Sequence, residues 1–242
     1  MALYVIGDLH LSKSTEKPMD VFGVRWADYM DKIEKNWRET VKYGDTVILA
    51  GDTSWSMSTD ELKADFDFIE ALPGNKIILK GNHDYWWQTQ AKLDAFVREN
   101  EYETIRFLHN NAYIVEDFLI CGSRGWYNDD KNTPIRGADS TKIIAREIQR
   151  IRHSVEYGRE LCRNSEGEKE ILMFLHFPAI FKGYICDEII MELYRAGVER
   201  CYYGHIHGNY EAPAVIDYAE IKFHLISADY VLFKPQKIEP KS

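Results

Sequence analysis

Short apolar strands alternate with helical segments in the N-terminal third of the chain, and this alternation restricts the fold more than any other feature of the sequence. Strands are predicted at residues 2–7, 46–50 and 76–80. Between them, apolar residues recur at helical spacing over 26–42, and the capping box Ser58-Thr59-Asp60-Glu61 opens a second helix that ends at Leu72. Strand–helix–strand order of this kind predicts parallel strands joined by right-handed crossovers.

The rest of the chain is less regular and predicts a more mixed sheet. We expect a hairpin at 112–116 and 118–121, a long helix at 140–162, a strand at 171–175, a helix at 187–196 and a strand at 200–203. The tail segments 221–226 and 230–233 are predicted to pair antiparallel. A parallel first half and a mixed second half predict an α/β fold of two packed sheets with helices outside. Without repeats or a Pro/Gly/Ser-rich linker, residues 1–242 are predicted to form a single domain.

Composition excludes several classes of protein. No apolar run approaches the roughly 18 residues of a membrane span, and the N-terminus lacks the basic leader of a signal peptide. The four cysteines are scattered, which predicts reduced core residues in a cytoplasmic protein. A net charge of -9 without a basic stripe argues against duplex nucleic acid as a partner, and no membrane partner is expected. The sequence carries no signal for an oligomeric state.

Polar residues follow each of five predicted strands. These clusters are Gly7-Asp8-Leu9-His10, Gly51-Asp52, Gly81-Asn82-His83-Asp84, His176 and Gly204-His205-Ile206-His207. Ligands of open α/β sheets bind outside the carboxyl ends of the strands, so we expect these side chains to meet at one edge. The other histidines, His109, His153 and His224, lie outside the clusters and are predicted to be structural.

The residue types at the strand ends are those of a metal site. Carboxylate, amide oxygen and imidazole without sulfur suit manganese best, with iron or zinc as alternatives. Seven candidate ligands are too many for one ion but fit two ions that share a carboxylate: Asp8, His10, Asp52, Asn82, His176, His205 and His207. Two divalent ions can hold a bridging hydroxide in line with phosphorus, which predicts a phosphoesterase.

These motifs, in this order, resemble those of the calcineurin-like metallophosphoesterase superfamily, and the resemblance runs from Asp8 to His207. It implies a four-layer α/β/β/α sandwich, in which two mixed sheets are flanked by helices. It also implies that Asp52 bridges two ions. One ion is then held by Asp8, His10, Asp52 and His207, and the other by Asp52, Asn82, His176 and His205. His83 is implied to be the catalytic histidine, oriented by Asp84.

The sequence departs from the family pattern at Thr53-Ser54-Trp55, where many members carry a further acidic or amide residue. Substrate-binding candidates therefore come from nearby residues. The Arg124 guanidinium is a candidate for bidentate contact with phosphate oxygens, and Arg25 for a further contact. Trp86 and Trp87 follow the third motif directly and are predicted to offer a stacking surface.

Three functions compete on this sequence. The first is a phosphomonoesterase acting on a small phosphorylated molecule or an exposed phosphate ester. The second is a phosphodiesterase or nuclease, because Asp8-Leu9-His10-Leu11 also resembles the first motif of DNA-repair nucleases and of lipid-nucleotide pyrophosphatases. Those nucleases carry an extra DNA-binding region, and the pyrophosphatases tend to have Arg where this chain has His83. The third is a non-catalytic scaffold, which loss of the catalytic histidine would mark.

Overall fold

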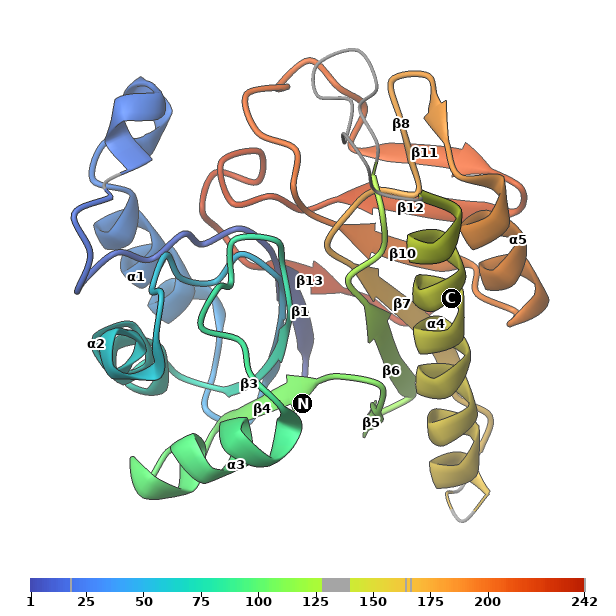
Figure 1. Cartoon of the computed structure of the whole chain (residues 1–242), viewed down its shortest axis with the longest axis horizontal. Helices are drawn as coiled ribbons and strands as arrows, with labels where there is room; N and C mark the ends of the chain where they lie inside the picture. The colour runs from blue at the N-terminus through green and yellow to red at the C-terminus, as the bar shows by residue number, and fades with distance from the viewer. Residues whose placement is uncertain (18, 128–139, 164, 166, 242) are drawn as a thin grey trace.

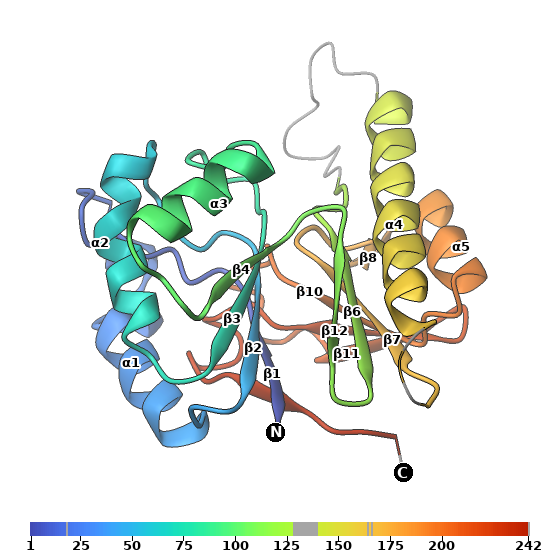
Figure 2. The ribbon, with the colours of Figure 1, turned by 90° about the horizontal axis from the view of Figure 1, so that it is seen from below.

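Two β-sheets face each other and helices cover both outer faces, so the molecule has the predicted four layers (Figure 2). The computed structural model describes residues 1–17, 19–127, 140–163, 165 and 167–241. The first half of the chain builds one sheet and the second half builds the other, except for one returning strand near the C-terminus (Figure 1).

The first sheet has the strand order β13-β1-β2-β3-β4. Four of its strands are parallel, as the alternating sequence predicted: β1 (Leu3–Ile6), β2 (Thr46–Ala50), β3 (Asn75–Leu79) and β4 (Ile105–Leu108). The fifth, β13 (Gln236–Ile238), pairs antiparallel with β1. Its outer face is covered by α1 (Tyr29–Thr40), α2 (Thr59–Glu70) and α3 (Gln90–Glu99) (Figure 2). Short 3-10 helices, η1 (Met19–Phe22) and η2 (Val24–Trp26), precede α1.

The second sheet has the order β11-β12-β10-β7-β6-β5. Its strands are β5 (Ala112–Val115), β6 (Phe118–Ser123), β7 (Glu170–Leu175), β10 (Arg200–Tyr203), β11 (Val215–Tyr218) and β12 (Ile221–Leu225). Its helices are α4 (Ser140–Cys162) and α5 (Asp187–Arg195), and β8 (Ile180–Phe181) and β9 (Tyr184–Ile185) form a small hairpin. No helix among the described residues has the length and apolarity needed to span a membrane.

The core divides into three apolar clusters because the central strands are buried on both faces. Along β1, Val5 faces the other sheet, whereas Tyr4 and Ile6 face the helices, as the two-residue period of a strand requires. The middle cluster also receives Ile48 from β2, and Phe174 from β7 lies opposite in it. This packing holds the carboxyl ends of both sets of parallel strands in fixed relation to each other.

The structure differs from the sequence-based prediction mainly in the tail. The predicted strand at 230–233 is wrong: that segment turns, with left-handed backbone at Leu232 and Phe233. Instead β12 pairs antiparallel with β11 and parallel with β10. The sequence analysis also missed α3, β4, β11, β13 and the small hairpin, because they are short or carry weak apolar patterns.

Candidate metal centre

The seven predicted ligands converge between the carboxyl ends of the two sheets. Asp8 and His10 follow β1, Asp52 follows β2 and Asn82 follows β3 in the first sheet. His176 follows β7, and His205 and His207 follow β10 in the second. Two groups of three residues have candidate ligand atoms that all lie within 4.8 Å of one another: Asp8, His10 and His207, and Asp52, His176 and His205.

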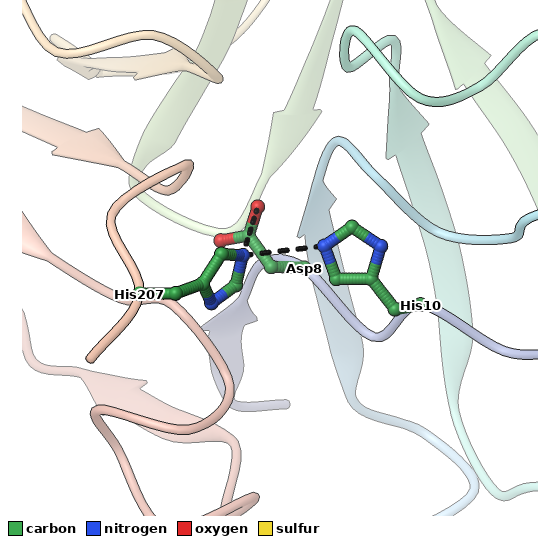
Figure 3. A group of neighbouring side chains, drawn as sticks. All are labelled: Asp8, His10 and His207. Atoms are coloured by element: carbon green, nitrogen blue, oxygen red, sulfur yellow. Dashed lines mark hydrogen bonds and ion pairs between the residues drawn. The ribbon is translucent and has the colours of Figure 1, made fainter. Parts of the chain in front are cut away.

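The residues of the first group come from both sheets and point toward one another (Figure 3). His207 Nε2 lies 3.2 Å from His10 Nε2 and 3.9 Å from Asp8 Oδ1. Asp8 and His10 are buried, whereas the His207 side chain is 29% exposed. The open side of this group therefore lies at His207.

The second group lies next to the first, and its Asp52 approaches His10 of the first group. Asp52 Oδ2 lies 3.4 Å from His176 Nε2 and 3.8 Å from His10 Nε2, so one carboxylate is within reach of both groups. The Asn82 amide oxygen lies 2.6 Å from His176 Nε2. All seven predicted ligands thus surround the same small volume.

Two histidines are fixed so that Nε2 faces this volume. The Ala50 carbonyl lies 3.1 Å from His176 Nδ1 and can only accept, so the proton of a neutral His176 ring is on Nδ1. Asp229 Oδ1 lies 2.8 Å from His207 Nδ1 and holds that ring in the same way. A carboxylate or carbonyl behind the imidazole is the usual support of a metal-ligating histidine.

These orientations leave lone pairs facing one another, which is the arrangement that a cation satisfies. The unprotonated Nε2 of His176 faces the Asn82 oxygen, and Nε2 of His207 faces Nε2 of His10. The contact between His176 and Asn82 is a poor hydrogen bond between neutral groups because both atoms are acceptors, whereas His10 can donate to His207 in one of its two tautomers. A divalent ion in each group accepts all of these lone pairs, so the residues fit two ions.

The electrostatics of the buried carboxylates favour the same conclusion. Burial, and then the neighbouring Asp52, raise the pKa of Asp8 to about 7, although His207 opposes the shift. Burial also raises the pKa of Asp52 to about 6. Burial lowers the pKa of His176 to about 3, so its ring stays neutral. Burial therefore disfavours the charged form of both carboxylates, and bound cations would offset that cost.

The backbone is strained where it carries the ligands. Asp8, His10, Asp52 and His205 adopt left-handed φ angles of 58°, 47°, 49° and 69°. Each such residue costs on the order of 1 kcal/mol or more and persists only where its surroundings hold it. Gly81 and Gly204 leave the room that the carboxylates require, since a Cβ at either position would collide with Asp52 or Asp8.

Comparison with known proteins agrees with this geometry. The model of one family, described as calcineurin-like phosphoesterase, matches residues 1–209. The chain belongs to the calcineurin-like phosphoesterase family. A search of curated proteins found no match.

Solved structures share the fold of this chain at low sequence identity. A protein of unknown function from Aquifex aeolicus is 18% identical, with a TM-score of 0.54, over 98% of this chain and 95% of that one. The phosphopantetheinyl hydrolase of Mycobacterium tuberculosis is 15% identical, with a TM-score of 0.54, over 99% and 96%. A protein from Thermus thermophilus is 11% identical, with a TM-score of 0.51, over 98% and 97%.

The predicted catalytic histidine, His83, lies beside the two groups. The His83 ring lies 5.7 Å from His10 and 4.4 Å from Trp55, measured between ring centroids. Its backbone N–H donates to Asp52 Oδ1 at 2.7 Å. Burial lowers the pKa of His83, and Asp52 opposes that shift.

Asp84 does not orient the His83 ring, contrary to the prediction from the family resemblance. Its buried carboxylate accepts hydrogen bonds from the backbone N–H groups of Gly81, Asp52 and Thr53 at 2.7 to 2.9 Å. The Ser54 N–H and the Trp86 indole lie slightly farther away, at 3.4 and 3.2 Å. Asp84 therefore ties the loop after β3 to the loop after β2. The His83 ring instead contacts the Tyr85 hydroxyl, which lies 3.4 Å from Nδ1.

The predicted stacking surface of Trp86 and Trp87 is wrong. Both side chains are buried in the cluster between the first sheet and its helices, at 1% and 8% exposure. The turn that follows Asp84 directs them inward, and Trp87 N–H donates to the Asp84 carbonyl. The aromatic rings that lie beside His83 are Trp55 and the exposed Tyr85.

The two arginine candidates have different surroundings. The Arg25 guanidinium stacks 3.6 Å above the centre of the Tyr210 ring and donates to the Asp229 carbonyl, so it is committed to the protein near His207. Arg124 is half-buried, and its Nε has no hydrogen-bond partner among the described residues. Its carbonyl accepts from the N–H groups of His176 and Phe177, which places it next to the second group.

Sequence analysis missed Asp229, which supports His207. Its carboxylate also accepts from the Gly208 N–H at 3.0 Å, and it is fully buried. The only signal in the sequence was an isolated acid between the apolar residues Ala228 and Tyr230. A buried acid in an apolar segment needs a partner, and that partner is the ligand histidine.

Proposed function

We propose that this phosphoesterase is a two-metal hydrolase that cleaves a phosphomonoester in a small molecule or in an exposed phosphate group. The observation that carries the proposal is the position of Asp52, which belongs to one donor group and lies 3.8 Å from His10 of the other. A pair of ions that act together on one phosphate needs such a shared ligand. Manganese is the ion we expect, with iron or zinc as alternatives, because the donors are carboxylate, amide and imidazole.

Two divalent ions, when bound, supply an activated water and neutralise charge on the phosphoryl oxygens. The protein holds their positions through carboxylates fixed by backbone N–H groups, as in Asp8, which accepts from His205 N–H at 2.9 and 3.0 Å. His83 is half-buried on the side of Asp52, packed against Trp55. We propose that His83, as an imidazolium, donates a proton to the departing oxygen of the ester.

The proposed substrate is small because nothing in the overall charge attracts a polymer. The chain carries 39 acidic and 30 basic residues. We therefore propose no duplex nucleic acid partner, no membrane partner and a cytoplasmic location. Binding to duplex DNA at about 50 and 200 mM salt tests this. Tight binding with a steep salt dependence would favour the nuclease alternative instead.

The experiment that tests the activity is reconstitution with manganese, iron or zinc, followed by assay of p-nitrophenyl phosphate and bis-p-nitrophenyl phosphate. We expect turnover of the monoester. His83→Gln should keep its metal content but lose on the order of 10²–10⁴ in turnover of an ester with a poor leaving group. His153→Gln, an exposed histidine on α4, is the matched control and should behave as wild type.

Three results would contradict parts of the proposal. Faster turnover of the diester would favour the phosphodiesterase. Near-normal turnover in His83→Gln would remove that residue from the reaction. A fully metal-loaded protein that cleaves neither ester would favour a non-catalytic scaffold.

A further inference from the structure

A second polar cavity lies at the same edge of the fold as the candidate metal centre. Its volume is about 120 Å³, and it opens between the ends of β3, β4 and β6 and the helix α4. The walls are formed by Leu79, Lys80, Leu108, His109, Asn110, Gly122, Ser123, Arg124 and Arg150. None of these residues belongs to the two donor groups.

Positive charge is concentrated in this cavity. Three of its lining side chains are cations, Lys80, Arg124 and Arg150, and none is an acid. A cluster of this kind is unexpected in a chain with a net charge of -9.

Two of these three cations form no ion pair with the residues that the structure describes. Among the described residues, Arg150 pairs with Glu147, but no carboxylate forms an ion pair with Lys80 or Arg124. Glu147 itself also accepts from Ser123 Oγ at 2.5 Å and from Gly125 N–H, so it is committed to the wall of the cavity. By contrast, Arg152 and Arg200 elsewhere in the fold each meet a carboxylate in two hydrogen bonds.

The cavity is built from the same chain segments that carry the ligands. Lys80 precedes Asn82 by two residues, so their Cα atoms lie within about 7 Å. Arg124 holds the segment of His176 through its carbonyl, and its guanidinium faces the Phe177 ring at 5.8 Å. That ring lies 4.5 Å from the His205 ring. A ligand bound at the second donor group is therefore a short distance from these cations.

We propose that this cavity is an anion subsite that holds a second phosphate group of the substrate while the first is cleaved at the metal centre. The inference deepens the proposed function and rests on it. Arg and Lys side chains that lack protein partners are the usual recognition elements for phosphate oxygens. The half-buried walls strengthen each contact by excluding water. The substrate class is accordingly a compound with two phosphate groups, separated by a short linker, rather than a simple monophosphate.

The test uses alkane bisphosphonates with two to eight methylene groups and the matching alkyl monophosphonates, titrated by calorimetry into manganese-loaded protein. At one linker length we expect the bisphosphonate to bind at least about tenfold more tightly than its monophosphonate, the effect of one charge-assisted hydrogen bond. Lys80→Gln and Arg124→Gln should each remove most of that gain. Arg146→Gln, which removes a cation of α4 that does not line the cavity, should keep it.

The outcomes separate this inference from the activity. Equal binding of bis- and monophosphonates at every length, or a gain that survives in both Lys80→Gln and Arg124→Gln, overturns the subsite. If Arg146→Gln loses the tighter binding of the bisphosphonate to the same extent, the subsite is overturned too, because the net charge of the protein then explains the binding. The titration does not depend on turnover, so a protein that shows the gain but cleaves no ester retains the subsite and loses the hydrolase. Circular dichroism of each variant checks that it folds. If only one of Lys80→Gln and Arg124→Gln folds, that variant alone is enough for the test.

Discussion

Replacing Asp84 by Asn tests whether this carboxylate builds the metal centre or serves the catalytic histidine. Its Oδ2 accepts from the Asp52 and Gly81 N–H groups, and its Oδ1 from Thr53, Ser54 and the Trp86 indole. Asn has one acceptor oxygen, so either orientation of its amide leaves at least two buried donors unsatisfied. At roughly 1–3 kcal/mol each, the loss is about 4 kcal/mol of folding free energy.

A loss of that size is measurable. For a chain of 242 residues it corresponds to a decrease in Tm of roughly 8–16 °C. Burial, and then Asp52, raise the pKa of Asp84 to about 7, so the comparison belongs at pH 8, where the wild-type carboxylate is ionised. Manganese affinity should fall as well, since the loops that carry Asp52 and Asn82 lose their common anchor.

The assay is thermal unfolding with and without chelator, combined with metal analysis after reconstitution. Asp94→Asn, in which an exposed acid of α3 is changed in the same way, is the matched control and should leave both quantities unchanged. The reasoning fails if Asp84→Asn unfolds within about 2 °C of wild type and keeps its metal while turnover collapses. That result would return Asp84 to the role of orienting His83.

Three further predictions concern other parts of the molecule. Asp52→Ala should lose both ions by elemental analysis after manganese reconstitution, and retention of a full pair would remove Asp52 from its shared position. Trp86→Ala should cost about 3–5 kcal/mol in denaturant unfolding because the ring is buried; unchanged stability with weakened substrate binding would restore it to the substrate pocket. Burial lowers the pKa of His224 to about 4, so its stabilising contribution is present above pH 6.5 and is lost as the pH falls toward 4. As the pH falls over that range, the free energy of unfolding of His224→Gln should decrease by about 1–2 kcal/mol less than that of the wild type, a value that allows for solvent screening. A pH profile identical to that of the wild type would contradict this.

Sequence reasoning identified the parallel strands and the ligand edge because both depend on local patterns. A strand such as β2, Thr46–Ala50, is apolar from Val47 onward and is followed by Gly51-Asp52, so its burial and its polar end are visible together. The segment β13 was missed because Gln236-Lys237-Ile238 is mostly polar and owes its structure to pairing with β1 at the other end of the chain. Helix α3 was missed because Leu93 is its only fully buried residue.

The wrong predictions about site residues have a common cause: residues adjacent in sequence were assumed to be adjacent in space. Asp84 follows His83, but the turn after β3 directs the carboxylate to backbone N–H groups instead of the ring. Trp86 and Trp87 follow the same motif and enter the core. In contrast, Trp55 and Asp229 reach the ligand histidines from distant segments, and no local pattern connects them.

Each donor group draws on both sheets, which gives bound ions a mechanical role in addition to a chemical one. Asp8, His10, Asp52 and Asn82 come from the chain before β5, and His176, His205 and His207 come from the chain after it. A cut between Leu108 and Ala112 would separate two fragments that each carry one sheet, apart from β13, and an incomplete ligand set. Because ions that bind only the assembled state stabilise it by mass action, reassociation of such fragments would follow the concentration of free divalent metal. The bound ions would then hold the two fragments together, and recovery of hydrolysis would measure their association.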